Sequence, residues 1–251
     1  MEHPFSRTEL LLGENCIQKL HDSRVAVFGV GGVGGYVTEA LARSGVGTLD
    51  LIDNDKVCLS NINRQIYALH STLGRYKVDV AKERVLDINP EATVNTYQTF
   101  YLPETAGEFD FTKYDYVVDA IDTVSGKLEL VEQANRCQTP IISSMGAGNK
   151  LNPAVFEVAD IYETSVCPLA KVMRRELKKR NIDHLKVVYS KEKPLVPCQR
   201  KGEEAGMETT ENTTSSSRRQ TPGSVAFVPS VVGLMIAGEV VRDLTGMGKE
   251  G

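Results

Sequence analysis

The sequence RVAVFGVGGVGGYVTEALARS, residues 24–44, decides the fold. Its first part, residues 24–29, is a short apolar run of the kind that forms a strand buried on both faces of a parallel sheet. Glycines follow at once in the pattern G-x-G-x-x-G, and apolar residues then recur at helical spacing from Val33 to Ser44. A strand, a glycine-rich turn and a helix in this order predict a site where backbone N–H groups bind phosphate.

The alternation of strands and helices continues along the chain. We expect strands at 24–29, 48–53, 93–97, 116–121 and 140–145, and helices at 33–44, 77–88 and 126–137. This order predicts an α/β fold of the Rossmann type, a doubly wound and mainly parallel sheet. Residues 154–161 and 184–190 alternate as strands without a convincing crossover helix, which predicts an additional antiparallel part in the C-terminal half.

The chain has 251 residues, 41% of them hydrophobic and 25% charged, which suits one soluble globular domain over residues 1–251. We expect a nucleotide-binding core over residues 1–165. Residues 166–223 should hold a basic helix, a strand and a flexible loop, because 201–223 are polar and Ser/Thr-rich with no apolar period. Residues 224–251 should form a closing strand and helix.

Cysteine usage and hydropathy exclude several other classes of protein. The five cysteines include no C-x-x-C pair, and no signal peptide is visible before them, so we expect a cytoplasmic protein without a disulfide scaffold and without zinc. The longest apolar stretch, residues 225–238, contains Pro229 and falls short of the ~20 residues that span a bilayer. We expect it to be a buried helix, although contact of this helix with a membrane surface stays open.

The glycine loop by itself leaves the ligand open. It fits NAD, FAD or S-adenosylmethionine better than ATP, and the glycines could also serve only close packing of helix and strand. Asp53 ends the next strand, where a ribose-binding acid is expected. The amide of Asn61, the guanidinium of Arg64 and the ammonium of Lys77 come after it, and such groups suit the negative charge of a triphosphate.

A carboxylate is also expected beside the phosphates. The stretch Asp119-Ala-Ile-Asp122 places acidic side chains at the end of the fourth strand, at the edge of the sheet where ligands bind. A carboxylate next to a phosphate cluster is useful if it holds Mg²⁺. The sequence therefore favours ATP and magnesium over a dinucleotide.

Five motifs occur in a characteristic order: GVGGVG at 29–34, DND at 53–55, SNINRQ at 60–65, GRYKV at 74–78 and DAID at 119–122. Over residues 5–165 the chain resembles the ubiquitin-activating-enzyme-like, ThiF-type adenylyltransferases. Three further segments resemble the branch of this family that modifies tRNA: Phe5-Ser6-Arg7, the sequence CPLAK at 167–171 and the C-terminal residues 233–244. The resemblance implies ATP-dependent dehydration and ring closure of threonylcarbamoyladenosine in tRNA, through activation of a carboxylate as an adenylate.

The resemblance also implies roles for individual residues. Catalysis would depend on Arg7, Arg64, Lys77 and Asp122, with Asp122 holding Mg²⁺ through ATP. Arg7 would reach the ATP of a partner subunit, which implies a homodimer. Asp53 would bind the ribose. The residues expected to bind the nucleotide are Gly29, Gly31, Gly32, Gly34, Asp53, Asp55, Asn61, Arg64, Gln65, Lys77 and Asp122.

A basic segment follows the core. Residues 171–201 contain 11 Lys or Arg against 3 Asp or Glu in a chain whose net charge is −4. Five of these cations recur at helical spacing and should share one face, which is either an ordinary solvated face or a surface that binds tRNA phosphates. The five are Lys171, Arg174, Arg175, Lys178 and Lys179.

Two alternatives remain beside the tRNA-modifying enzyme. The chain could adenylate the C-terminal glycine of a small ubiquitin-like sulfur-carrier protein, although many such activators have the zinc cysteines that this chain lacks. It could also be a nucleotide-binding scaffold without turnover, for which Arg64, Lys77 and Asp122 would be unnecessary. Cys167 and Cys198 are candidates for a catalytic thiol, and a cysteine desulfurase or another sulfur-relay protein stays open as a partner.

Overall fold

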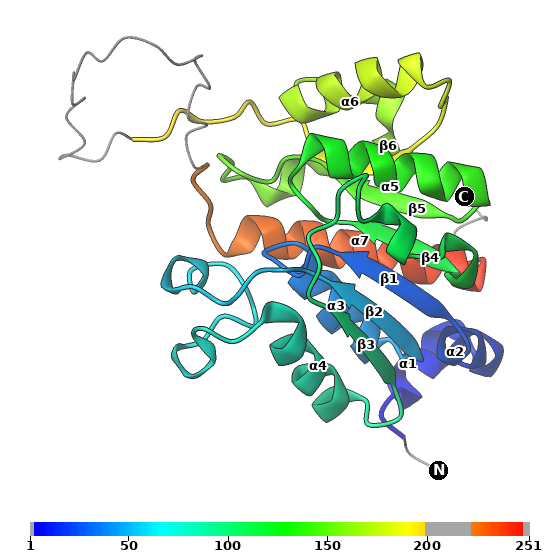
Figure 1. The fold of residues 1–251 in the computed structure, drawn as a ribbon. Helices are drawn as coiled ribbons and strands as arrows, with labels where there is room; N and C mark the ends of the chain where they lie inside the picture. The colour runs from blue at the N-terminus through cyan, green and yellow to red at the C-terminus, as the bar shows by residue number, and fades with distance from the viewer. Residues whose placement is uncertain (1–2, 199–221, 248–251) are drawn as a thin grey trace, which may run out of the picture.

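The computed structural model describes residues 3–198 and 222–247, which form a seven-stranded sheet covered by helices on both faces (Figure 1). The strand order is β3-β2-β1-β4-β5-β7-β6. All neighbouring strands are parallel except β6 and β7, which are antiparallel. The predicted α/β sheet with an antiparallel part is confirmed. The strands are β1 (Arg24–Phe28), β2 (Thr48–Ile52), β3 (Thr93–Tyr97), β4 (Tyr116–Asp119), β5 (Ile141–Ser144), β6 (Phe156–Asp160) and β7 (Lys186–Ser190).

The central strand β1 supplies side chains to both hydrophobic layers. Val25 and Val27 join the larger core, whereas Ala26 and Phe28 face an aromatic cluster on the other side of the sheet. Successive side chains of a strand point to opposite faces, so a continuous apolar run is what a strand covered on both faces needs. The helices are α1 (Ser6–Leu12), α2 (Glu14–His21), α3 (Gly34–Arg43), α4 (Lys77–Ile88), α5 (Val124–Cys137), α6 (Pro168–Lys179) and α7 (Phe227–Thr245).

The strand register brings several chain segments to one edge of the sheet. Phe28, the last residue of β1, is opposite Ile52 of β2 and Asp119 of β4, which are also the last residues of their strands. The segments that follow these three strands therefore start at the same level. This is why residues far apart in the sequence can form one site at the carboxyl edge.

The N-terminal helix α1 lies at the opposite edge. The Phe5 ring lies 3.4 Å from the position that a Cβ atom on Gly45 would take, in the turn that precedes β2. α1 buries no residue, and Leu10 and Leu11 are 86% and 80% exposed. These two neighbouring leucines therefore form a small apolar area on the surface of α1.

One predicted element is wrong. The structure has no strand at residues 224–226; residues 222–226 are irregular, and α7 begins at Phe227. This short stretch bonds to loops instead of to a strand, because Gly223 and Asn149 exchange two hydrogen bonds and the Asn63 side chain donates to the Ser224 carbonyl oxygen. Of the loop expected at 201–223, all but Pro222 and Gly223 lie outside the described residues.

Candidate active site

The glycine loop connects β1 to α3 and is too crowded for side chains. Gly29 has a φ of +89°, and a Cβ atom there would lie 2.7 Å from the Ala120 carbonyl oxygen. A Cβ on Gly34 would lie 1.7 Å from the Gly29 carbonyl oxygen, so the helix starts in direct contact with the loop. No side chain caps α3 at its N-cap residue, Val33. The N-terminus of α3 is thus free to receive an anion.

Asp53 holds the glycine loop to the end of β2. One carboxylate oxygen accepts a hydrogen bond from the Val30 N–H at 2.8 Å, and the other accepts one from the Asp55 N–H at 2.8 Å. Burial raises the pKa of Asp53, and the nearby charge of Lys77 acts against this rise. The carboxylate stands where the ribose of a nucleotide lies in folds of this type.

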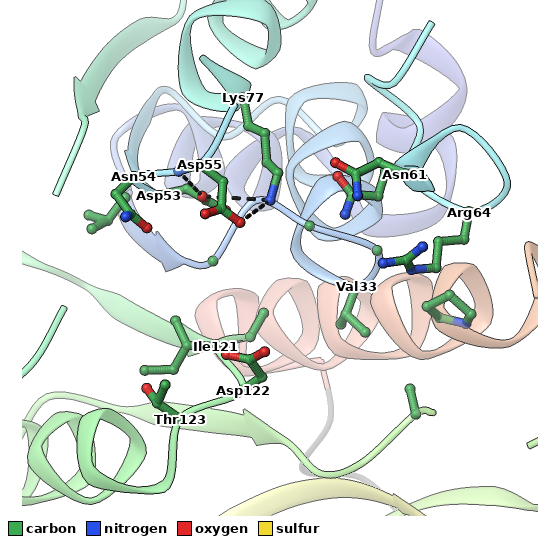
Figure 2. Close-up of a pocket in the computed structure, with 18 of the residues that line it drawn as sticks. Val33, Asp53, Asn54, Asp55, Asn61, Arg64, Lys77, Ile121, Asp122 and Thr123 are labelled. Carbon is green, nitrogen blue, oxygen red and sulfur yellow. Dashed lines mark hydrogen bonds and ion pairs between the residues drawn. The ribbon is translucent and has the colours of Figure 1, made fainter. Parts of the chain in front are cut away.

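Lys77, the first residue of α4, projects a buried ammonium group into the same region (Figure 2). It is 5% exposed, and its Nζ donates to the Asp55 carboxylate at 2.6 Å and lies 3.8 Å from the Asp53 carboxylate. The ammonium has three N–H donors and uses one of them on Asp55, so the others can bind phosphate oxygens. Asp55 therefore keeps the ammonium in place for a phosphate ligand.

Asn61 and Arg64 lie across the glycine loop from Asp53 (Figure 2). The Asn61 side chain accepts a hydrogen bond from the Cys58 N–H at 3.1 Å, which fixes its orientation. The Arg64 Nη1 donates to the Ser60 carbonyl oxygen at 2.8 Å and to the Asn63 side chain at 3.0 Å. Since Nη1 alone makes these bonds, the rest of the guanidinium remains available for an anion.

A pocket of about 400 Å³ joins these residues to Asp122, which faces them from the segment after β4 (Figure 2). Every residue predicted to bind the nucleotide lines this pocket except Gly34, which instead packs beneath the loop. The volume is within the usual range for small-molecule sites. A glycine loop with an open helix N-terminus, a ribose-side carboxylate, two cations and a further carboxylate fit ATP with a magnesium ion bound through its phosphates. Among the described residues no group of three or more His, Cys, Asp or Glu side chains could hold a metal ion without such a ligand.

The pocket also has walls that sequence reasoning missed. Residues 99–101 follow β3, and Ala147 and Gly148 follow β5, so their places at the carboxyl ends of strands could have marked them. Three further residues also line the pocket: Pro222 from the predicted loop, Ser224 from the predicted strand and Pro229 from the first turn of α7. Only the tertiary fold brings these last residues to the site.

The predicted basic helix exists, but its five cations are not equivalent. α6 spans Pro168–Lys179, and Lys171, Arg175, Lys178 and Lys179 are exposed. Arg174 is half-buried instead: its guanidinium donates to the Thr164 carbonyl oxygen at 2.9 Å and to the Thr164 hydroxyl. Arg174 therefore holds α6 to the segment before it and is not on the free face.

Two other predictions concern regions outside the pocket. Arg7 lies on α1, near the amino end of β2, and does not line the pocket of its own chain. In residues 3–198 and 222–247 no helix has both the length and the apolar character needed to cross a membrane.

Comparison with known proteins agrees with this geometry. The model of the ThiF family matches residues 5–251. The tRNA threonylcarbamoyladenosine dehydratase of Bacillus subtilis (strain 168) is 45% identical over 245 residues, which cover 97% of this chain and 95% of that protein. The crystal structure of E. coli tRNA N6-threonylcarbamoyladenosine dehydratase in complex with ATP has a TM-score of 0.84 and 31% identity, covering 99% of this chain and 96% of that one. A complex of the same enzyme with AMP has a TM-score of 0.83.

Proposed function

The chain belongs to the ThiF family, and we propose that it is an ATP-dependent tRNA threonylcarbamoyladenosine dehydratase. The observation that carries this proposal is the convergence of Asp53, Arg64, Lys77 and Asp122 on one pocket beside the glycine loop. The choice of threonylcarbamoyladenosine in tRNA as the substrate is supported by the length and identity of the match to the Bacillus subtilis enzyme. Because the substrate is tRNA, we place the reaction in the cytoplasm.

The proposed reaction has two steps. First, the carboxylate of the threonylcarbamoyl group attacks the α-phosphorus of ATP, which releases pyrophosphate and forms an acyl adenylate. Next, the urea group of the same substrate attacks the activated carboxyl carbon and gives up a proton, the ring closes, and AMP leaves with one oxygen of the former carboxylate, so that the nucleoside becomes lighter by the elements of one water. The second step needs no enzyme thiol, because attack within one molecule has a high effective molarity.

The residues of the pocket have distinct parts in this chemistry. Asp53 orients the ribose, and Asn61, Gln65 and Lys77 bind phosphate oxygens together with Arg64. Magnesium, bound through ATP and held by Asp122, would neutralise part of the phosphate charge. The cations stabilise the negative charge that develops on the departing pyrophosphate.

The proposal predicts a specific product. Purified protein with ATP, Mg²⁺ and tRNA that carries threonylcarbamoyladenosine should yield a modified nucleoside lighter by one water, as mass spectrometry of the digested tRNA would show. tRNA without the threonylcarbamoyl group is the control and should give no product. The alternative, activation of a sulfur carrier, would be favoured if pyrophosphate exchange required a carrier protein's C-terminal glycine and the tRNA stayed unchanged.

We further propose that the exposed cations of α6 bind tRNA phosphates. The Lys171→Ala/Lys178→Ala variant should weaken tRNA binding and lower the slope of log affinity against log salt by about one unit for each lost contact. ATP affinity should not change, since α6 does not line the pocket. The matched control is Lys19→Ala/Lys113→Ala, which removes two exposed lysines elsewhere on the surface. Identical salt curves for the wild type and the α6 variant would show that α6 is an ordinary solvated face.

We also propose that the active form is a homodimer in which Arg7 enters the pocket of the partner. Arg7 is exposed and lies at the end of the sheet opposite its own pocket, beside the exposed side chains of Leu10 and Leu11. A two-fold partner would cover these leucines and bring Arg7 to a second nucleotide site.

A further inference from the structure

A buried ion pair lies directly behind the wall of the pocket that carries Asp122. Lys127 is 1% exposed and Asp119 is fully buried. The Lys127 ammonium donates to both oxygens of the Asp119 carboxylate at 3.0 Å and to the Ser144 carbonyl oxygen at 2.7 Å. The Ser143 hydroxyl donates to the same carboxylate. One ammonium group thus joins the start of α5 to the ends of β4 and β5.

These contacts reach both walls of the pocket. Asp119 is the last residue of β4, and its carboxylate accepts a hydrogen bond from the Ile121 N–H at 3.3 Å, one residue before Asp122. Ser144 is the last residue of β5 and precedes Ala147 and Gly148, which line the pocket on its other side. The positions of both walls therefore depend on the residues that Lys127 binds.

The neighbouring residue of α5, Gly126, is packed tightly against one wall of the pocket. A Cβ atom on Gly126 would lie 2.7 Å from the Ile121 side chain, 2.8 Å from the Tyr101 carbonyl oxygen and 2.9 Å from the Thr123 hydroxyl. Ile121, Tyr101 and Thr123 all line the pocket. The first turn of α5 is therefore packed against the pocket wall at Gly126 and bonded behind it at Lys127.

Stability alone does not account for this arrangement. Removing two charges from water costs several kcal/mol, and replacing a buried ion pair with apolar side chains of similar volume is often neutral or stabilising. An apolar pair would fill the same space, but it could not orient the Ile121 N–H or the Ser144 carbonyl. A charged pair with these hydrogen bonds can instead fix the position of the adjoining segment.

We propose that Lys127 is a positioning residue that acts through Asp119 to hold Asp122 where it meets the magnesium–ATP complex. The inference rests on the proposed role of Asp122. It adds a residue that never touches the nucleotide but sets the geometry of one that does.

The test is a double-mutant cycle between Lys127→Met and Asp122→Asn, read by calorimetry as the gain in ATP affinity when Mg²⁺ is added. Each single variant should lose most of this gain, and the double variant should lose no more than either one, because both act on one interaction. Turnover of Lys127→Met should fall by about tenfold to a hundredfold, as expected for a misplaced catalytic group. Since Lys127→Met leaves a buried charge unpaired, Asp119→Leu/Lys127→Met is made as well and should show the same losses with a fold of near-normal stability.

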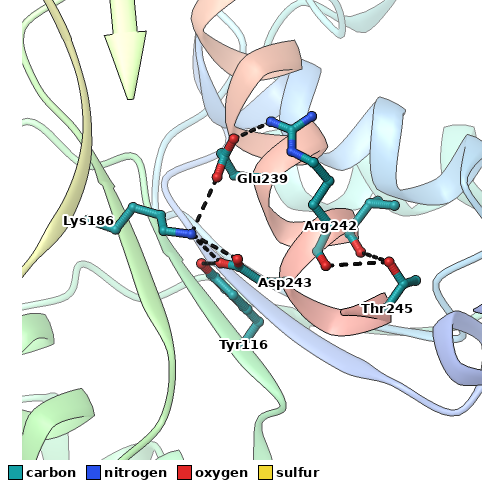
Figure 3. Close-up of polar contacts among 7 residues, drawn as sticks. Tyr116, Lys186, Glu239, Arg242, Asp243 and Thr245 are labelled. Carbon is teal, nitrogen blue, oxygen red and sulfur yellow. Dashed lines mark hydrogen bonds and ion pairs between the residues drawn. The ribbon is translucent and has the colours of Figure 1, made fainter. Parts of the chain in front are cut away.

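The structure offers a matched control at the other end of the sheet (Figure 3). There the Lys186 ammonium donates to both oxygens of Asp243 at 2.8 and 2.7 Å, and the Tyr116 hydroxyl donates to the same carboxylate at 2.6 Å. The interacting groups are of the same kind as those of Lys127, Asp119 and Ser143. The Lys186 and Asp243 side chains are 27% and 32% exposed, however, and the cluster does not line the nucleotide pocket. Lys186→Met should lower the melting temperature and leave the magnesium-dependent gain in ATP affinity intact.

The outcomes separate the inference from the function on which it rests. Suppose that Asp122→Asn loses much of the gain in ATP affinity and that the loss in the double variant is the sum of the two single losses. The inference is then overturned and the proposed function stands. The same holds if Lys127→Met or Asp119→Leu/Lys127→Met keeps the full gain. Full magnesium dependence in Asp122→Asn would overturn both the role of Asp122 and the role of Lys127.

Discussion

The Arg64→Ala variant is expected to keep its fold, and its kcat/KM is expected to fall by a factor of about 10²–10³. This factor corresponds to ~3–4 kcal/mol of transition-state stabilisation. Arg64 is half-buried at the pocket and is not part of the hydrophobic core. Its guanidinium already has one nitrogen bonded to Ser60 and Asn63, which orients the remaining donors. The loss should therefore be in turnover and not in stability.

Steady-state kinetics with ATP and modified tRNA, together with a thermal melt, would measure this effect. Arg64→Lys should be intermediate, because an ammonium keeps the charge but cannot make the two parallel hydrogen bonds of a guanidinium. Arg75→Ala is the control: Arg75 lies in the same connection, pairs with Glu83 and does not line the pocket. Activity of Arg64→Ala within threefold of the wild type would contradict the assigned role.

The sequence predicts most of this site because local patterns define it. The apolar run of β1 requires a strand buried on both faces, and the glycines after it require close contact with the next helix. Asp53 and Asp122 follow strands whose parallel register is set by the same topology, so their approach to one edge can be predicted without coordinates. Arg64 and Lys77 lie in polar motifs of the connection between a strand and a helix, and their positive charges there indicate a phosphate ligand.

The errors and omissions have a different origin. Residues 224–226 form no strand, because the hydrogen bonds of Gly223 and Ser224 go to Asn149 and Asn63, residues that are distant in the sequence. Arg174 shares a helical face with the other cations of α6, but its guanidinium donates hydrogen bonds to backbone carbonyl oxygens of the preceding segment. The Lys127–Asp119 pair consists of charged residues in a pattern that otherwise indicates a solvated helix and a strand end. In each case the deciding partner is set by tertiary contact, which single-sequence periodicity does not report.

Mixing two inactive variants should restore activity if Arg7 acts across a dimer. Arg7→Ala and Arg64→Ala should each lose turnover when studied alone. A mixed dimer of the two has one site that combines the Arg64 of one chain with the Arg7 of the other, while its second site lacks both. Random pairing makes about half of the dimers mixed, so the mixture should recover roughly one quarter of the wild-type activity per chain.

The experiment uses the two variants co-expressed with different tags, so that mixed dimers can also be purified and should then reach about half of the wild-type activity. The expectation follows from the position of Arg7 on α1, beside Gly45 at the amino end of β2, while the pocket lies at the carboxyl end. A side chain cannot span a whole strand within its own chain, so an essential Arg7 has to work in a neighbour. Arg7→Ala/Arg64→Ala chains, which carry both changes, are the control and should restore nothing when mixed with either single variant. Purified mixed dimers that stay inactive, or a fully active monomer in light scattering, would show that Arg7 is not shared between subunits.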